Sequence, residues 1–219
     1  MKLLVAAATE AEIQPTIAWL KESGRTDVET IITGIGLFST AFALGKRLAG
    51  ADRPALVLQA GIAGTFDRNM KLGDALLVDK EYFGDLGAED NGVFRDLFSI
   101  GLWKHDQHPF TNNYLLNPFV RIPEQLAQLP RASAVSVNTV SGETATIARL
   151  EQQFAPTLES MEGAALHYAC LMENVPFLQL RTVSNYVEQR DKSKWDIKSA
   201  VIRLNGLLRD TINEWNNER

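Results

Sequence analysis

Two glutamates, Glu12 and Glu162, have surroundings suited to acid–base chemistry. Glu12 follows an apolar run at residues 3–8, and Glu162 stands beside Met161 and a run of small residues. A carboxylate in apolar company is costly unless it has partners, which favours a functional position for Glu162. Such groups act as general bases or stabilise developing positive charge. For Glu12 a solvated helix face is an equally good interpretation, because its predicted helix is rich in carboxylates.

Glycine-rich or polar residues follow several other apolar runs, namely Gly34-Ile35-Gly36, Gly61–Gly64, Ser184 and Asn185. The first lacks the third glycine of a dinucleotide-binding fingerprint, since Ser39 stands at that position. We therefore interpret it as a turn between a strand and a helix. Gly61–Gly64 alone is also consistent with a tight turn, and Asn185 with a turn after a strand.

The histidines and the cysteine do not indicate a metal site. His105 and His108 have a spacing that a metal could bridge, but no cysteine or third histidine stands near them. His167 and Cys170 fall in a predicted apolar helix, where Cys170 is expected to be a small buried apolar residue. We predict no metal and no cofactor.

Short apolar runs alternate with helical patterns along the chain. Strands are predicted at residues 3–8, 28–33, 55–60, 73–82, 134–140 and 177–183, and helices at 10–21, 38–48, 162–173 and 197–215. Nearly continuous apolar strands separated by helices indicate an α/β fold with a central, largely parallel mixed sheet flanked by helices. In an open sheet of this kind ligands bind beyond the carboxyl ends of the strands, where Glu12, Gly61–Gly64 and Asn185 stand.

The 219 residues are expected to form a single domain, residues 1–219. Residues 84–133 interrupt the alternation and are rich in glycine, proline, asparagine and aromatic residues. We predict that they form a long loop or flap rather than a second domain. Loops of this length within a compact domain are usually functional or mobile.

Composition argues against several classes of partner. The net charge is −5 with the two signs mixed along the chain, so no basic stripe is present to neutralise a nucleic acid backbone. The single cysteine, Cys170, allows no internal disulfide and fits a reducing compartment. The apolar run after Lys2 ends at Thr9, which is short for a secretory signal, and no run approaches the roughly 20 residues of a membrane span. We predict a cytoplasmic protein that binds neither nucleic acid nor membrane.

Seven short motifs together resemble the purine nucleoside phosphorylase/nucleosidase superfamily. They are Ala8–Ile13, Thr33–Gly36, Gly61–Gly64, Lys71–Asp74, Ser141–Glu143, Ser160–Ala165 and Arg181–Asn185. Their order and spacing hold across nearly the whole chain, so the combination is far more specific than any single motif. The resemblance implies the superfamily's fold and a reaction that breaks a bond between ribose and a base, with a nucleoside and water as the partners.

The resemblance also implies roles for individual residues. Glu12 would be the general base that activates water, and Met161 and Glu162 would hold the ribose hydroxyls. Further substrate contacts would come from Ile62, Ala63, Gly64, Thr144, Ala145 and Ser184. Cleavage of the bond develops positive charge on the sugar, so a carboxylate against the ribose hydroxyls stabilises the transition state selectively.

Asn185 stands where adenine nucleosidases of the superfamily have an aspartate. With Arg190, Asp191 and Trp195, the run at residues 181–187 resembles the futalosine hydrolase branch, whose members release hypoxanthine from futalosine in an alternative menaquinone pathway. Asn185 would then act on the base as the third catalytic residue. An amide offers a donor and an acceptor in one plane, which suits the O6 and N7 atoms of a 6-oxopurine.

Other functions remain as alternatives. An adenine nucleosidase is the second interpretation. A phosphorylase is the third, because no arginine stands in or beside the glycine loops to hold a phosphate. A non-catalytic nucleoside-binding protein is the alternative of a different class, and the presence of both Glu12 and Glu162 counts against it.

The substituent on the 5′ carbon is expected to meet residues 84–133. Futalosine carries a benzoate there, and a carboxylate entering a pocket needs a cationic or hydrogen-bonding partner. Candidates are Arg95, Lys104, His105 and His108, with the rings of Phe98, Trp103 and Phe110 beside them. For most of these residues a solvated loop is the other interpretation. The resemblance also implies a homo-oligomer, a dimer or larger, whose neighbouring subunit closes this pocket.

Overall fold

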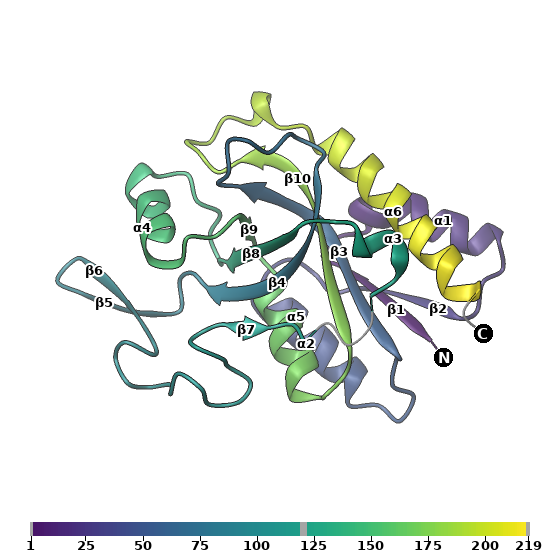
Figure 1. The fold of residues 1–219 in the computed structure, drawn as a ribbon, viewed down its shortest axis with the longest axis horizontal. Helices are drawn as coiled ribbons and strands as arrows, with labels where there is room; N and C mark the ends of the chain where they lie inside the picture. Colours follow the sequence, from purple (N-terminus) through teal and green to yellow (C-terminus); the bar gives the residue numbers. More distant parts are fainter. Residues whose placement is uncertain (1, 119–121, 218–219) are drawn as a thin grey trace.

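The computed structural model describes residues 2–118 and 122–217; residues 1, 119–121 and 218–219, which belong to the predicted domain and flap, lie outside the described residues. A central sheet lies between two pairs of helices (Figure 1). Helices α1 (Glu10–Glu22) and α6 (Ile197–Asn217) cover one face, and α2 (Leu37–Leu48) and α5 (Gly163–Met172) cover the other. The predicted α/β architecture is confirmed.

The remaining elements complete the sheet and its connections. The strands of the central sheet are β1 (Leu3–Ala7), β2 (Val28–Ile32), β3 (Leu56–Thr65), β4 (Ala75–Phe83), β7 (Leu115–Leu116), β8 (Arg131–Ser136), β9 (Leu158–Ser160) and β10 (Phe177–Tyr186). A separate hairpin consists of β5 (Gly87–Asp90) and β6 (Val93–Asp96). The other helices are α3 (Glu124–Ala127), α4 (Thr144–Phe154) and the short 3₁₀ helix η1 (Lys192–Lys194).

The sheet is mixed and largely parallel, as predicted, but it is partly closed. Strand β3 pairs in parallel with β1 and with β10. From β10 the pairing continues through β4, β8 and β9, and β9 returns to β3 in antiparallel orientation. An open sheet was expected from the sequence. The closure brings the ends of β3, β9 and β10 to one place, which matters for the site described below.

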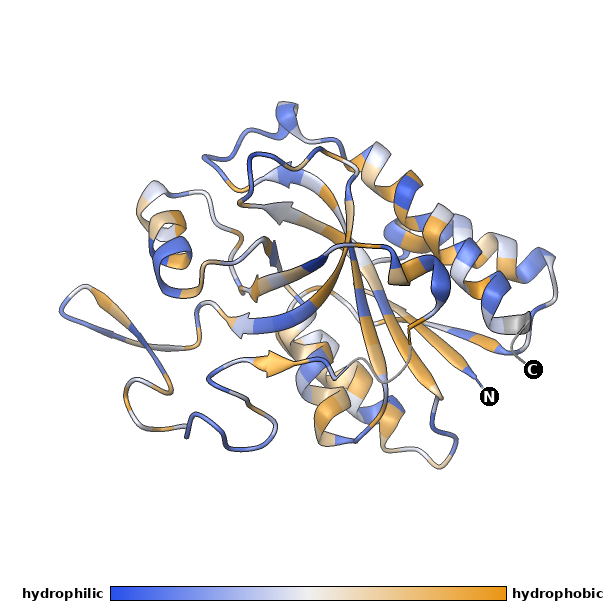
Figure 2. Ribbon diagram, in the orientation of Figure 1, coloured by the Kyte–Doolittle hydropathy of each residue, from blue (hydrophilic) through white to orange (hydrophobic). Residues whose placement is uncertain are grey.

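Alternate residues of the central strands point into two separate apolar layers. In β1, Leu3 and Val5 belong to the layer under α1 and α6, whereas Leu4 and Ala6 belong to the layer under α2 and α5. Helix α6 buries Leu204, Leu208, Ile212 and Trp215 on the first layer. This burial on both faces explains the continuous apolar strand sequences, which Figure 2 shows along the sheet.

Two strands are longer than their sequences suggest. Gly61–Gly64, for which a tight turn was one interpretation, lies within β3, and Ser184 and Asn185 lie within β10. Glycine in a strand often marks a place where another group approaches closely. Here Gly61 pairs with Arg181 and Gly64 pairs with Asn185, across an irregularity in the register after Val183.

The segment at residues 84–133 has more structure than a loop. It contains the β5–β6 hairpin, β7, α3 and the beginning of β8. Phe98, Trp103 and Phe110 form an aromatic cluster, with Phe98 and Phe110 5.0 Å apart between ring centroids. The cluster packs with Leu115 against Ala164 of α5, so this part of the segment is anchored to the domain.

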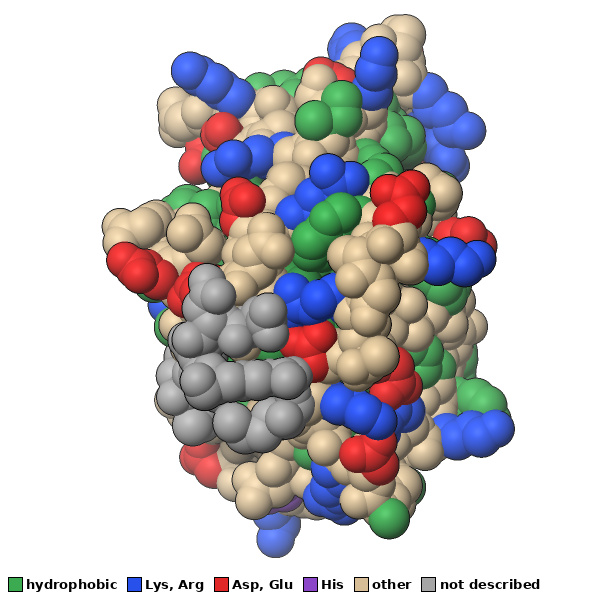
Figure 3. Space-filling view, turned by 90° about the vertical axis from the view of Figure 1, so that its right-hand side faces the viewer, with side chains coloured by type: hydrophobic (Ala, Val, Ile, Leu, Met, Phe, Trp, Pro, Cys, Tyr) green, Lys and Arg blue, Asp and Glu red, His purple; other side chains and the backbone are tan. Residues whose placement is uncertain are grey.

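The surface charge and the helix composition bear on nucleic acid and membranes as possible partners. Figure 3 looks onto the side of the molecule where α1 and α6 lie and shows basic and acidic side chains interspersed there. No helix among residues 2–118 and 122–217 is long and apolar enough to cross a membrane.

A buried polar cluster lies behind the first turn of α5. Glu81 of β4 is fully buried and accepts hydrogen bonds from Gln179 Nε2 at 2.7 Å and from Ser136 Oγ at 3.0 Å. A Cβ at Gly163 would overlap the Glu81 carboxylate, so only glycine fits there. Burial raises the pKa of Glu81 from 4.5 to about 7, and burial lowers the pKa of the neighbouring His167 from 6.5 to about 3. Both groups are thereby favoured in their neutral forms.

The raised pKa of Glu81 predicts a pH-dependent loss of stability. Between about pH 4.5 and pH 7 the folded state holds this proton more tightly than the unfolded state, so the contribution of Glu81 to the free energy of unfolding falls as the pH rises through that range. Glu81→Gln imitates the neutral form. Urea denaturation should show that the variant gains stability relative to wild type from pH 4.5 to 7 and then reaches a plateau. His167 contributes an opposing pH dependence, which cancels when the free energies of unfolding of the variant and wild type are subtracted. If that difference did not change with pH, the raised pKa of Glu81 would be contradicted.

Candidate active site

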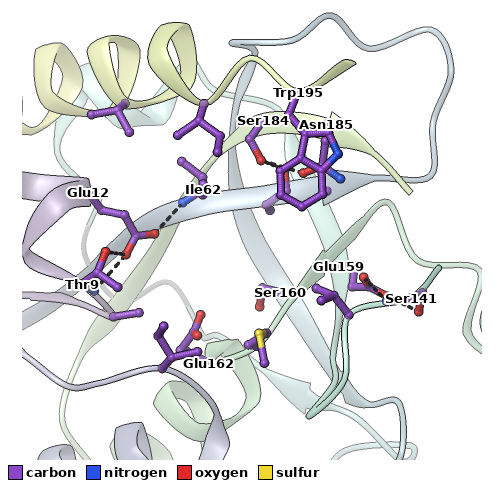
Figure 4. Close-up of a pocket in the computed structure, with 18 of the residues that line it drawn as sticks. Thr9, Glu12, Ile62, Ser141, Glu159, Ser160, Glu162, Ser184, Asn185 and Trp195 are labelled. Carbon is purple, nitrogen blue, oxygen red and sulfur yellow. Dashed lines mark hydrogen bonds between the residues drawn. The ribbon is translucent and has the colours of Figure 1, made fainter. Parts of the chain in front are cut away.

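A cavity of about 420 Å³ opens where β3, β9 and β10 end. The first turn of α1, the turn before α2, the loops after β8 and β10 and the beginning of α6 also line it. Its size is that of a small-molecule pocket. Figure 4 shows Glu12 and Glu162 at one end, and Asn185, Trp195, Glu159 and Ser141 at the other.

Glu12 is held in place by the turn that begins α1. Its Oε2 accepts hydrogen bonds from the Thr9 backbone N–H at 3.0 Å and from Thr9 Oγ1 at 2.9 Å. Its Oε1 accepts from the backbone N–H of Ile62 at 3.1 Å. An ionised carboxylate can accept about four hydrogen bonds, so one position remains for a molecule in the cavity.

Glu162 has the partners that its apolar sequence context demands. It precedes α5, and its Oε1 accepts a hydrogen bond from the backbone N–H of Gly36 at 3.1 Å. Gly36 has a φ of 90°, a conformation that glycine adopts without strain. Oε2 of Glu162 lies 3.5 Å from Nη1 of Arg181.

Arg181 is the cation of this end of the site. It lies within β10, is only 1% exposed, and donates through Nη2 to Gln59 Oε1 at 2.9 Å and through Nη1 to the carbonyl of Ile62 at 3.3 Å. A Cβ at Gly61 would overlap Nη1 of Arg181 and lie 3.0 Å from Oε1 of Glu12. The guanidinium therefore contacts Glu162 and lies on the same side of Gly61 as Glu12. Sequence reasoning quoted Arg181 in a motif without giving it a role, although an arginine inside an apolar strand is a sign of buried partners.

Asn185 presents its amide in one fixed orientation. Ser184 Oγ donates to Oδ1 at 2.8 Å, and Nδ2 donates to the carbonyl of Tyr186 at 3.0 Å. Because a carbonyl only accepts, the nitrogen must be the atom that faces Tyr186. A Cβ at Gly64 would lie 3.1 Å from this nitrogen, so the glycine makes room for the amide.

Glu159 and Ser141 lie at the same end as Asn185, and sequence reasoning missed Glu159. Ser141 donates to its carboxylate twice, from the backbone N–H at 3.0 Å and from Oγ at 2.5 Å. Burial raises the pKa of Glu159, while the two hydrogen bonds from Ser141 oppose that change. The sequence feature that could have indicated Glu159 is its charge between Leu158 and Ser160, in a short buried strand.

Most of the substrate-contact candidates line the cavity, namely Glu12, Ile62, Ala63, Gly64, Met161, Glu162, Ser184 and Asn185. Thr144 and Ala145 do not. They begin α4 and are exposed, because α4 packs its apolar side, with Leu150 and Phe154, against Val135 and Val137. Val140 and Ser141, just before α4, line the cavity instead.

The candidates for the 5′ substituent do not line this cavity either. Arg95 lies on the β5–β6 hairpin, 3.5 Å from Asp90, and the ring of His105 lies against Phe98. Lys104 and His108 are exposed beside the aromatic cluster. The rings of Phe98, Trp103 and Phe110 pack on one another because this is how they bury their surface.

Within the described ranges 2–118 and 122–217, no three histidine, cysteine, aspartate or glutamate side chains are grouped to hold a metal ion. Cys170 is buried in the layer under α2 and α5, and burial raises the pKa of its thiol. The cavity is lined by the carboxylates of Glu12, Glu159, Glu162 and Glu188, by Arg190 and by the amide of Asn185, and the buried Arg181 lies against Glu162. This site can bind a polar, partly flat molecule and remove a proton from water beside it.

The family model of the phosphorylase superfamily matches residues 16–213, and the chain belongs to that superfamily. Within it, the chain is similar to futalosine hydrolase of Thermus thermophilus, with 31% identity over 216 residues that cover 96% of this chain and 92% of the relative.

Two solved structures share the fold. Futalosine hydrolase of Helicobacter pylori has a TM-score of 0.78 and 16% identity, covering 98% of each chain. A 5′-methylthioadenosine/S-adenosylhomocysteine nucleosidase from Colwellia psychrerythraea, solved with adenine, has a TM-score of 0.75 and 21% identity, covering 98% of this chain and 95% of that one.

The close packing around Gly61 predicts that an added methyl group is not tolerated. Gly61→Ala forces Arg181 and Glu12 apart in a place where Gln59 and Ile62 hold them, so we expect a loss of about 1–3 kcal/mol in the free energy of unfolding. Gly45→Ala in α2 is the matched control, because a Cβ there has open space, and it should stabilise the protein by about 0.4–1 kcal/mol. Chemical denaturation measures both. Equal stability of Gly61→Ala and wild type would show that the packing is looser than described.

Proposed function

We propose that this protein hydrolyses the N-glycosidic bond of futalosine, releasing hypoxanthine and dehypoxanthine futalosine. One observation carries the proposal: the paired carboxylates of Glu12 and Glu162 lie at one end of a cavity whose other end holds the oriented amide of Asn185. The similarity to futalosine hydrolases over nearly the whole chain supports it.

The two carboxylates suit the two halves of the reaction. As the bond between C1′ and N9 breaks, the ribose becomes cationic and the base takes the electron pair. Glu162 accepts hydrogen bonds from the ribose hydroxyls, and these bonds strengthen as the sugar becomes positive. Glu12 takes a proton from the water that attacks C1′, since it is fixed by Thr9 and Ile62 and has one acceptor position left.

The burial of Arg181, the arginine beside Gly61, supports hydrolysis over phosphorolysis. Arg181 does stand beside Gly61, which sequence reasoning overlooked when it found no arginine near these loops. It is nevertheless covered, and its guanidinium is engaged by Gln59, by the Ile62 carbonyl and by Glu162. A buried guanidinium with these partners serves to balance the carboxylates rather than to bind a phosphate from solvent.

The base is selected by Asn185. With one N–H directed to Tyr186 and one lone pair taken by Ser184, the amide retains one N–H for O6 and one lone pair for a protonated N7. An aspartate here would oppose one of its oxygens to the Tyr186 carbonyl unless it were protonated. The local structure thus suits an amide and a 6-oxopurine, which favours futalosine over the adenine nucleosides of the alternative activity.

The compartment, the pathway and the assembly of the protein are part of the same proposal. We infer a cytoplasmic enzyme of menaquinone biosynthesis that acts as a homo-oligomer. Exposed apolar side chains on neighbouring helices support an assembly, because Phe38 and Phe42 of α2 are 87% and 73% exposed and Met172 of α5 is 49% exposed. Clusters of exposed apolar residues usually mark contact surfaces, and a second copy of the chain fits this one.

The carboxylates are tested by neutral replacement. Glu12→Gln removes the base and Glu162→Gln weakens the charge facing the sugar, so each should lower kcat for futalosine by about 10²–10⁴. Glu10→Gln is the matched control, because Glu10 lies on the same turn of α1, is exposed and does not line the cavity. Chromatography of released hypoxanthine, with and without phosphate, is the measurement. Wild-type turnover in either cavity variant, or a requirement for phosphate, would refute the mechanism.

The base preference is tested at Asn185. Wild type should strongly prefer futalosine to aminofutalosine. Asn185→Asp should lower kcat/KM for futalosine and raise it, at least relatively, for aminofutalosine, because mismatched buried hydrogen-bonding groups discriminate by up to about 10⁴–10⁵. The surface substitution Asn174→Asp is the control and should leave the ratio of the two values unchanged. If the ratio also stays the same in Asn185→Asp, the amide does not read the base and an adenine nucleosidase regains support.

A further inference from the structure

Three neighbouring strands place two polar side chains on either side of a glycine. Asn185 of β10 pairs with Gly64 of β3, and Gly64 pairs in turn with Glu159 of β9. Residues paired across strands carry their side chains on the same face of the sheet. Two strand spacings of about 4.8 Å put the backbones of Asn185 and Glu159 roughly 10 Å apart. Gly64 has no side chain, and all three residues line the cavity.

Glu159 keeps acceptor positions for a ligand. It is 5% exposed and lines the cavity, and Ser141 supplies one hydrogen bond to each of its carboxylate oxygens. Each oxygen can accept a second bond. No ion pair with Glu159 occurs among the side chains that the structure describes. Burial raises the pKa of Glu159, and the two donors from Ser141 counteract this by stabilising the ionised carboxylate. A further donor is the partner that this buried carboxylate lacks.

A 6-oxopurine supplies such a donor. Hypoxanthine carries a hydrogen on N1, next to the O6 that Asn185 is proposed to bind, whereas adenine has a lone pair on N1. An ionised carboxylate accepts the N1–H of hypoxanthine but opposes the N1 lone pair of adenine. At N1 hypoxanthine is thus a hydrogen-bond donor and adenine an acceptor. A carboxylate facing N1 can therefore discriminate between the two purines.

We propose that Glu159 accepts a hydrogen bond from N1–H of the purine and, with Asn185 on the other side of Gly64, determines the preference for 6-oxopurines. The inference rests on the proposed function for the identity of the base. Glu159 is a specificity residue that contacts the base and takes no part in breaking the bond. Ser141 positions it, because both of its donors hold the carboxylate at the cavity wall.

Binding of free bases tests this without relying on catalysis. Calorimetry would give dissociation constants of hypoxanthine, adenine and 1-methylhypoxanthine, which lacks the N1–H, for wild type, Glu159→Gln and Glu159→Ala. Both variants should weaken hypoxanthine binding by about tenfold or more, which is the usual loss for a hydrogen bond to a charged group. They should not weaken 1-methylhypoxanthine or adenine, and Glu159→Ala should bind 1-methylhypoxanthine more tightly, since it makes room for the methyl group.

A purely structural role for Glu159 has a different outcome. Loss of the anchor for Ser141 alone would weaken all three bases alike, and unchanged ratios between them would overturn the proposal. Ser141→Ala separates the two effects, because it keeps the carboxylate and should preserve the preference for hypoxanthine over 1-methylhypoxanthine. If wild type hydrolysed futalosine while the ratios stayed constant, only the role of Glu159 would fail. If the ratios shifted although futalosine was not hydrolysed, the proposed substrate would fail and the base-reading role would stand.

Discussion

The rest of the site depends on the buried cation of Arg181. It is fixed by Gln59 and the Ile62 carbonyl and lies within reach of Glu162, and its guanidinium packs against Gly61 beside Glu12. Removing one partner of a buried ion pair typically costs about 3–5 kcal/mol, because the other charge is left uncompensated. Without Arg181 the buried carboxylate of Glu162 would therefore lose its cationic partner. The position of Arg181 also depends on the backbone of β3, since only a glycine at position 61 leaves room for the guanidinium.

The same arrangement recurs at the other end of the cavity. Gly64 has no side chain, so the amide of Asn185 from β10 packs close to it, and Glu159 of β9 pairs with it on the other side. Both ends thus depend on β3, whose glycines admit functional groups from its neighbours. The partial closure of the sheet is what makes β9 one of those neighbours, because β9 and β10 pair with β3 on opposite sides.

Sequence patterns predicted the layers of the fold well, since burial on both faces makes strands such as Leu3–Ala7 continuously apolar. They also indicated Glu12, Glu162 and Asn185, which do line one cavity. They failed where tertiary contacts override local tendencies. A tight turn was one interpretation of Gly61–Gly64 because glycine weakens isolated strands, yet pairing with β10 continues β3 through it. The family resemblance implied that Thr144 contacts the substrate, and a resemblance of motifs does not reveal that Thr144, at the start of α4, is exposed outside the cavity.

In the proposed reaction, water activated at Glu12 replaces the base of futalosine. Reaction in water enriched in ¹⁸O, followed by mass spectrometry of both products, tests it most directly. The proposed reaction predicts that hypoxanthine appears without added phosphate and that the sugar product carries one ¹⁸O at C1′. Release of hypoxanthine that depends on phosphate and yields a sugar 1-phosphate, or no release from futalosine at all, would contradict it.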